Sequence, residues 1–179
     1  ISYYHVNDNP PFDDYFGTGD AMQAALRKAE GIAPLPDPAV LVGEPGCPFD
    51  EMAYCIHRHS RQASGPFLIL DCRLINQKTW DFLFMDRKSP LFARRNTLCF
   101  QNAGTLTDAQ RDTMIAYLGE AMAHGNRLIF IFAESGGDPS SLELHLRRHA
   151  LYSTIRLPAL RERPADIPGI AAHYVNLLN

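Results

Sequence analysis

The stretch AVLVGEPGCPFDEMAYCIHRHS, residues 39–60, decides how this chain folds. Its first residues form a continuous apolar run, which predicts a strand buried on both faces, and residues 50–60 have the apolar spacing of a helix. A loop that contains Gly43 and Gly46 joins the two elements. In α/β proteins such a loop is a common phosphate site, because the N–H groups at the start of the helix point toward the ligand.

The same alternation of short apolar runs and helical patterns continues along the chain. Further strands are predicted at 67–70, 96–100, 127–132 and 152–156, and helices from Asp20 to about residue 33, over 107–125, over 140–150 and from Asp166 onward, with residues 80–84 left open between helix and loop. Continuous apolar strands, each followed by a helix, are typical of a parallel sheet with both faces covered. We therefore expect a three-layer α/β/α domain with a five-stranded parallel sheet.

The chain divides into three parts by composition. Residues 1–16 read as an irregular leader or linker because Pro10 and Pro11 block regular structure. Residues 17–165 form the expected α/β domain, and residues 166–179 begin a further helix. The chain starts without methionine and ends in that helix, so we expect it to be a piece of a longer protein.

Composition excludes several classes of function. The net charge of −3 gives no overall attraction to nucleic acid. The four cysteines lack the close pairing of a zinc or redox motif, and neither His57 with His59 nor His145 with His149 has a carboxylate at metal-site spacing, so we expect no metal. No signal peptide or membrane-length apolar run is present, which predicts a cytoplasmic protein without membrane contact.

The loop after the first strand has the position of a phosphate loop but not its chemistry. A working loop needs consecutive N–H groups, a lysine for the phosphates and a hydroxyl for the metal. Pro45 and Pro48 lack an N–H, Phe49 stands where the lysine is needed, and Asp50 would repel phosphate. We interpret the loop as the remnant of a nucleotide site, or simply as a strand-to-helix turn; the remnant consists of Gly43, Glu44, Gly46, Cys47, Pro48, Phe49 and Asp50.

Three motifs in this order resemble the AAA+ domain of sigma-54-dependent transcription activators, the bacterial enhancer-binding proteins. GEPGCPFDEMAYCIHRHSRQASGPFLILDC, from residue 43, is similar to the family's Walker A segment with G-E-S-G-T-G-K-E. GTGDAMQ, from residue 17, resembles the opening G-x-S-x-A-M-Q, and LPALRERPADI, from residue 157, resembles L-P-P-L-R-E-R-x-E-D-I. The resemblance implies an AAA+ core in which residues 166–179 are the first helix of a truncated helical lid.

The departures from the family pattern fall on its catalytic groups. The Walker A lysine corresponds to Phe49, and the Walker B aspartate and glutamate correspond to Gln101 and Asn102. The sensor pair falls near Phe132 and Ala133, and the two finger arginines become Glu143 and His149. Only 24 residues separate Cys72 from Thr97, where the family has a longer segment with the GAFTGA loop that touches the sigma factor.

These departures predict a domain without ATPase activity and without a cofactor. We expect it to act in self-association or in binding another regulator subunit, with DNA reached only through a domain outside this chain. Because the GAFTGA loop is absent, direct contact with sigma-54 is not expected. The aromatic residues Trp80, Phe82, Phe84 and Phe92 occupy the shortened segment and are expected to fill the core.

Two alternatives use arginines. A ligand sensor could bind a nucleotide or cyclic-di-GMP through Arg58, Arg61 and Arg73, since guanidinium groups bind phosphate bidentately and stack on bases. A residual ATPase could use ATP with Arg147 and Arg148, which are adjacent to the altered finger positions.

Overall fold

The computed structural model describes residues 2–3, 16–133 and 139–178. Its strands form one six-stranded sheet in the order β1-β3-β4-β5-β2-β6, in which every pair except β1–β3 is parallel. The strands are β1 Ser2–Tyr3, β2 Ala39–Gly43, β3 Phe67–Asp71, β4 Thr97–Gln101, β5 Arg127–Ala133 and β6 Ser153–Arg156. The predicted five-stranded parallel sheet is therefore confirmed, and β1 is added at its edge.

Strand β1 corrects the expectation that residues 1–16 are irregular. Ser2 and Tyr3 pair antiparallel with Ile69 and Leu68 of β3. Phe16, at the other end of the same stretch, is fully buried in the core. Neither contact could be inferred from Pro10-Pro11, and Pro10-Pro11 itself lies outside the described residues.

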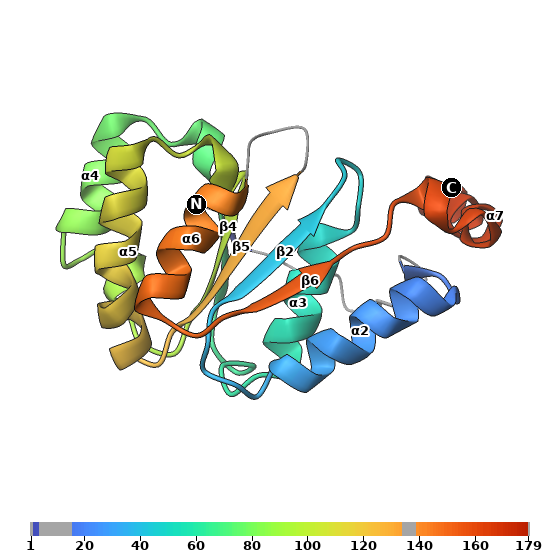
Figure 1. The fold of residues 1–179 in the computed structure, drawn as a ribbon, viewed down its shortest axis with the longest axis horizontal. Helices are drawn as coiled ribbons and strands as arrows, with labels where there is room; N and C mark the ends of the chain where they lie inside the picture. Colours follow the sequence, from blue (N-terminus) through green and yellow to red (C-terminus); the bar gives the residue numbers. More distant parts are fainter. Residues whose placement is uncertain (1, 4–15, 134–138, 179) are drawn as a thin grey trace.

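Helices cover both faces of the sheet (Figure 1). One core lies between the sheet and α2 and α3, and the other between the sheet and α4, α5 and α6. Alternate residues of β2 supply them, with Leu41 on the first side and Val40 on the second. The helices are α2 Asp20–Ile32, α3 Phe49–Arg58, α4 Gln77–Met85, α5 Asp108–Ala123, α6 Pro139–His149 and α7 Ile167–Leu177.

The segment that replaces the longer family insertion folds as a short helix. Asn76 caps α4 by accepting from the N–H of Thr79 at 2.9 Å. Trp80 and Phe84 are buried against the sheet, as expected for core aromatics. The expectation is wrong for Phe82, which is 45% exposed because it lies on the outer side of the helix.

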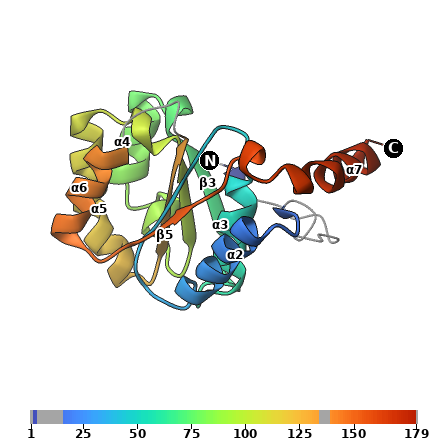
Figure 2. The ribbon, with the colours of Figure 1, turned by 45° about the vertical axis from the view of Figure 1, so that its right-hand side comes forward.

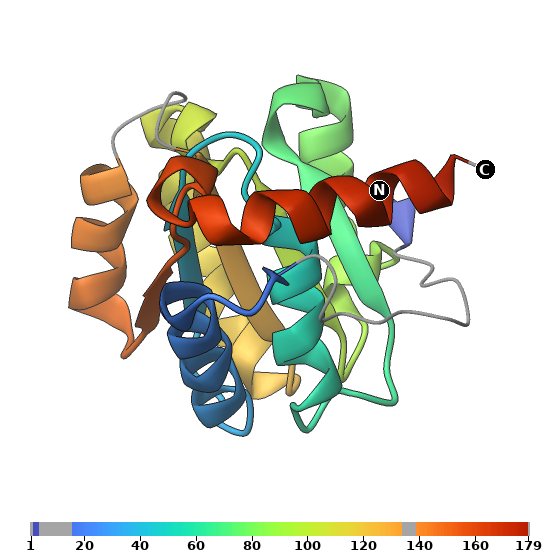
Figure 3. The same ribbon diagram turned by 90° about the vertical axis from the view of Figure 1, so that its right-hand side faces the viewer.

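Helix α7 extends away from the layered body (Figure 2), and Figure 3 shows its full length. Its residues are exposed or half-buried, including Tyr174 and Val175. No helix within the described ranges has both the length and the apolar character needed to cross a membrane.

A buried clasp joins the start of the domain to the connection before α7. The Asp166 carboxylate accepts from the N–H groups of Thr18 at 3.1 Å and Gly19 at 2.9 Å. The Arg163 guanidinium donates to the Phe16 carbonyl at 2.7 Å and lies 3.7 Å from Asp166. The motifs GTGDAMQ and LPALRERPADI are thus adjacent in space.

Arg127, the first residue of β5, similarly joins two segments that are far apart in the sequence. Its guanidinium is buried and donates to the carbonyls of Ile32 at 3.1 Å and Ala33 at 2.9 Å, at the end of α2. A helix C-terminus has unpaired carbonyls and a partial negative charge, so a cation there stabilises it. Burial lowers the pKa of Arg127 to about 10, and the group stays charged at neutral pH.

The clasp predicts a specific sensitivity at Gly17. Gly17 has a positive φ of 72°, and a Cβ there would lie 2.4 Å from the Asp166 Cγ. Gly17→Ala should lower the free energy of unfolding by about 3 kcal/mol, from left-handed strain plus loss of the Asp166 hydrogen bonds. Urea denaturation followed by circular dichroism measures the change.

Gly46→Ala is the matched control, because Gly46 also has a positive φ, of 94°, but a Cβ there would meet no heavy atom within 4 Å. It should cost about 1 kcal/mol from backbone strain alone. Equal losses in the two variants would show that the Asp166 contact contributes nothing to the effect.

Candidate functional site

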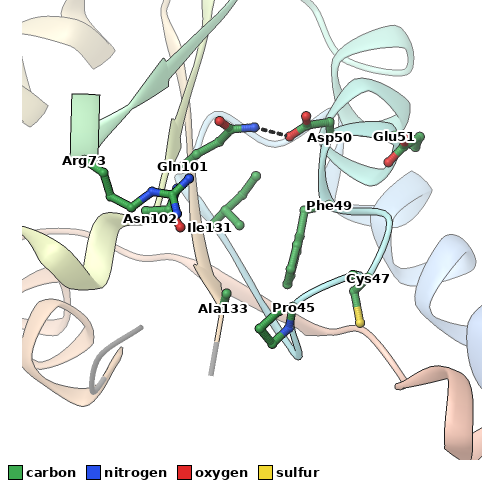
Figure 4. A pocket seen from close by; sticks show the side chains of 11 residues that line it. Pro45, Cys47, Phe49, Asp50, Glu51, Arg73, Gln101, Asn102, Ile131 and Ala133 are labelled. Atoms are coloured by element: carbon green, nitrogen blue, oxygen red, sulfur yellow. Dashed lines mark hydrogen bonds between the residues drawn. The ribbon is translucent and has the colours of Figure 1, made fainter. Parts of the chain in front are cut away.

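A cleft lies at the carboxyl edge of the sheet, where the β2–α3 loop meets the ends of β4 and β5 (Figure 4). This is the edge at which open α/β sheets bind ligands. The cleft has a volume of about 360 Å³. Its lining residues are Pro45, Gly46, Cys47, Phe49, Asp50, Glu51, Arg73, Gln101, Asn102, Ile131 and Ala133.

The β2–α3 loop turns several of its N–H groups toward its own backbone. The N–H of Cys47 donates to the Glu44 carbonyl at 3.1 Å, and the N–H of Phe49 donates to the Cys47 carbonyl at 2.8 Å. Pro45 and Pro48 have no N–H to offer. Four consecutive loop positions that could cradle a phosphate are therefore reduced to Gly46 alone, between Pro45 and Pro48.

Phe49 occupies the lysine position, where it places an uncharged apolar ring instead of a cation. It is half-buried and packs against the core on the α2–α3 side of the sheet. In Figure 4 its ring lies between Asp50 and Pro45. An aromatic ring at this point cannot neutralise phosphate charge.

The loop still needs its first glycine. A Cβ on Gly43 would lie 3.2 Å from both the Cys47 Sγ and the Leu157 carbonyl oxygen. Gly43 therefore has a packing role in this loop.

A hydrogen bond spans the middle of the cleft. The Gln101 Nε2 donates to the Asp50 Oδ1 at 2.6 Å, linking the Walker B position on β4 to the first turn of α3 (Figure 4). Burial raises the pKa of Asp50, and the negative charge of Asp71 adds to the rise, while the bond from Gln101 opposes it. Burial also raises the pKa of Glu51.

A second set of contacts occupies the neighbouring strand ends. The Asn102 Nδ2 donates to the Asp71 Oδ1 at 2.8 Å, and the Arg73 guanidinium pairs with the same carboxylate at 2.9 Å. Burial raises the pKa of Asp71, but the bonds from Arg73 and Asn102 outweigh it and the net shift is downward. Asn102 has a left-handed backbone, with φ of 54°, which asparagine tolerates.

Sequence reasoning did not identify Asp71 as part of the site. The available signal was a carboxylate directly after the buried residues of a strand, at the edge where ligands bind. The loop is also joined to the connection before α7, since Glu44 forms an ion pair with Arg161. The Cys47 Sγ lies 3.7 Å from the Pro158 carbonyl oxygen.

The structure does not gather the predicted arginines. Arg58 ends α3, which is 10 residues or about 15 Å long, and Arg61 follows it, so both lie near the amino edge of the sheet. Arg73 follows the carboxyl end of β3. Arg147 and Arg148 end α6 just before β6, again at the amino edge, where Arg147 donates to the Tyr152 hydroxyl at 3.0 Å.

The predicted altered positions of the fingers also lie on α6. His149 is exposed at its end, while the side chain of Glu143 is outside the described residues. Phe132, at the position predicted for the sensor pair, is buried near the end of β5, and Ala133 lines the cleft there.

Histidines and cysteines do not form a metal site in the described part of the chain, where no group of three or more potential ligand residues is found. His57 is buried, and its Nδ1 lies 2.8 Å from the Thr97 Oγ1. The four cysteines are unpaired thiols, and burial raises the pKa of Cys72 to about 12.

A known family model matches the part of the chain that contains the β2–α3 loop and strands β3 and β4. The model of the family described as "Sigma-54 interaction domain" matches residues 15–116, which is more than half of the 179 residues. The chain belongs to the sigma-54 interaction domain family.

Curated relatives of this sigma-54 interaction domain are bacterial regulators. NtrC of Klebsiella pneumoniae is 25% identical over 213 residues, covering 99% of this chain and 45% of NtrC. FlbD of Caulobacter vibrioides is 24% identical, covering 87% of this chain and 40% of FlbD. The chain thus spans less than half of these relatives, and the NtrC match is longer than the 179 residues here.

Solved structures agree on the fold. NtrX from Brucella abortus in complex with ATP has a TM-score of 0.74 at 22% identity, covering 90% of this chain and 42% of NtrX. The P-loop NTPase domain of the sigma-54 transport activator from E. coli has a TM-score of 0.54 at 19% identity, covering 80% of this chain and 99% of that domain. The predicted AAA+ P-loop-type core is confirmed.

His57 gives a pH prediction that is independent of the cleft. Burial lowers its folded-state pKa to about 4, below the ordinary value of 6.5, so the unfolded chain takes up the proton first as the pH falls. The stability that the neutral imidazole contributes is present above about pH 6.5 and is lost toward pH 4, by about 2 kcal/mol between pH 7 and pH 5.

Urea denaturation at pH 7 and pH 5 measures this loss. His57→Gln retains a hydrogen-bonding group for Thr97 but cannot titrate, so it should lose about 2 kcal/mol less than the unsubstituted chain over the same interval. Parallel pH profiles for the two proteins would contradict the assignment.

Proposed function

We propose that this chain is a catalytically inactive AAA+ module of a bacterial transcription regulator and acts through self-association or binding of another regulator subunit. The observation that carries the proposal is the 2.6 Å hydrogen bond between Gln101 and Asp50. It links the two positions between which a working site holds its metal and phosphates. An amide and a carboxylate that bind each other there supply no cation to neutralise phosphate.

The lysine, Walker B and finger positions all lack the charged residues that phosphoryl transfer needs. Catalysis of this reaction consists of positioning and charge neutralisation, by a loop lysine, a metal held by a carboxylate and an arginine. Here these positions hold Phe49, Gln101 and Glu143 or His149. Removing one such group typically costs a factor of about 10² to 10³ in rate, and several are missing together.

The two arginine-based alternatives receive less support. A sensor built from Arg58, Arg61 and Arg73 would need groups from opposite edges of the sheet, and Arg73 is already paired with Asp71. A residual ATPase would have to use Arg147 or Arg148, which end α6 at the edge away from the cleft.

The proposal also concerns two partners, sigma-54 and DNA. We propose that contact with sigma-54 is absent, since 24 residues with a packed helix α4 stand in place of the longer family segment. Any contact with DNA is proposed to belong to a domain outside this chain.

Isothermal titration calorimetry is the direct test of the inactive site. We expect no saturable heat when the purified chain is titrated with Mg-ATP, ADP or cyclic-di-GMP up to millimolar concentration. Binding of Mg-ATP with micromolar affinity would refute the proposal and call for a phosphate-release assay. Binding of cyclic-di-GMP alone would favour the sensor, with Arg73→Ala as the first variant.

A matched gain-of-binding variant makes the negative result informative. The quadruple substitution Pro48→Gly, Phe49→Lys, Gln101→Asp and Asn102→Glu restores the family residues at four of the altered positions, those of the Walker A lysine, its preceding glycine and the Walker B acids. We expect this variant to bind Mg-ATP measurably while the unsubstituted chain does not. A variant that folds normally and still fails to bind would show that these four side chains are not what prevents Mg-ATP binding.

A further inference from the structure

Helix α4 presents an apolar ridge to solvent. Lys78, Phe82 and Met85 lie at i, i+4 and i+7, which places them on one side of the helix. Phe82 is 45% exposed and Met85 is 70% exposed. We call these three residues the α4 ridge.

The ridge is held rigidly from beneath. Trp80 and Phe84 on the inner side contact each other with tilted rings whose centroids are 4.3 Å apart, and Phe84 contacts Tyr117 of α5 edge-on at 5.4 Å. The chain after the helix is also fixed, since the Asn126 Nδ2 donates to the Ala93 carbonyl at 2.8 Å. A preorganised apolar surface loses little conformational entropy on binding.

Helices α5 and α6 lie side by side on the same side of the sheet (Figures 1 and 2). A groove of about 520 Å³ is lined by residues of these two helices. Ala116 and Gly119 leave it open, because they carry no long side chain and a Cβ on Gly119 would meet no heavy atom within 4 Å. We call this the α5/α6 groove; it is lined by Asp112, Ile115, Ala116, Gly119, Met122 and His145, among others.

We propose that the α4 ridge of one copy docks in the α5/α6 groove of a second copy of this chain. The inference rests on the proposed self-association and names its surface. Phe82 and Met85 supply the apolar filling that Ile115 and Met122 would cover. Lys78 is complementary to Asp112 at the rim, and neither makes an ion pair within the described residues of its own subunit.

Charge favours the α4 ridge of a second copy over α7, the other exposed apolar helix, as the occupant of the α5/α6 groove. Residues 73–95 contain six Lys or Arg and two Asp or Glu, in a chain with a net charge of −3, so the rest of the molecule is acidic. Helix α7 has no Lys, Arg, Asp or Glu between Ile167 and Leu177 and therefore offers no Lys or Arg to pair with Asp112.

Symmetry follows from where the two features lie. Ridge and groove are on the same layer of the domain, so two copies related by a two-fold axis can bury both ridges and both grooves at once. The arrangement is a closed dimer. Every substitution in it therefore acts twice.

Sedimentation equilibrium of the full chain, without nucleotide, tests the proposal. Phe82→Glu with Met85→Glu should weaken the dimer at least about tenfold, because it removes the apolar side chains that fill the groove. Gly119→Gln, made separately, should weaken it as much, because the longer side chain occupies the groove. Gly31→Gln on α2 is the matched control, because Gly31 also has open space around it, and should leave the dimer unchanged. Both glycine variants should keep their melting temperature, since glutamine favours a helix over glycine.

A charge swap identifies the contact itself. Lys78→Glu and Asp112→Lys should each weaken the dimer, and the double variant should recover most of the loss. A dimer whose dissociation constant is unchanged by both the ridge and the groove variants would overturn this interface but not the proposed self-association. Sensitivity at Gly119 without sensitivity at Phe82 and Met85 overturns the ridge as occupant. An unsubstituted chain that stays monomeric overturns the interface together with self-association, and the nucleotide titration still judges the inactive site separately.

Discussion

The burial of five parallel strands on both faces is the constraint on which the rest of this structure depends. Residues such as Leu41 and Phe130 fill the two cores completely, so polar chemistry is confined to the edges of the sheet. At the carboxyl edge, loops from several strands converge on one cleft. The AAA+ fold is present with Phe49, Gln101 and Asn102 at these edge positions.

Several polar side chains in and around the cleft bind other side chains of the same chain. Gln101 binds Asp50, Asn102 and Arg73 bind Asp71, and Arg161 binds Glu44. These polar groups, which could otherwise contact a ligand, already have partners in the chain. In the function proposed above, such a domain acts through contact with other proteins, and the outer surface of α4 and α5 is the surface proposed for that contact.

Much of this could be predicted from the sequence, because strands, loops and the altered positions of Phe49 and Gln101 are local features. The hydrogen-bond partners could not, since Asp50 and Gln101 are 51 residues apart and Asp166 and Gly19 are 147 apart. The arginine grouping failed for the same reason: Arg58 and Arg73 are close in sequence but lie at opposite edges of the sheet. The exposure of Phe82 depends on which side of α4 faces the core, which its composition alone leaves undetermined.

The most direct test of the closed site is the side-chain amide signal of Gln101 in a ¹H–¹⁵N spectrum. Donation to the half-buried Asp50 carboxylate should shift this signal away from the range of free glutamine amides and slow its exchange with water. The account predicts that millimolar Mg-ATP leaves the signal in place, and that Asp50→Asn moves it. A Gln101 amide that resonates as a free group, or that moves on adding Mg-ATP, would contradict the account.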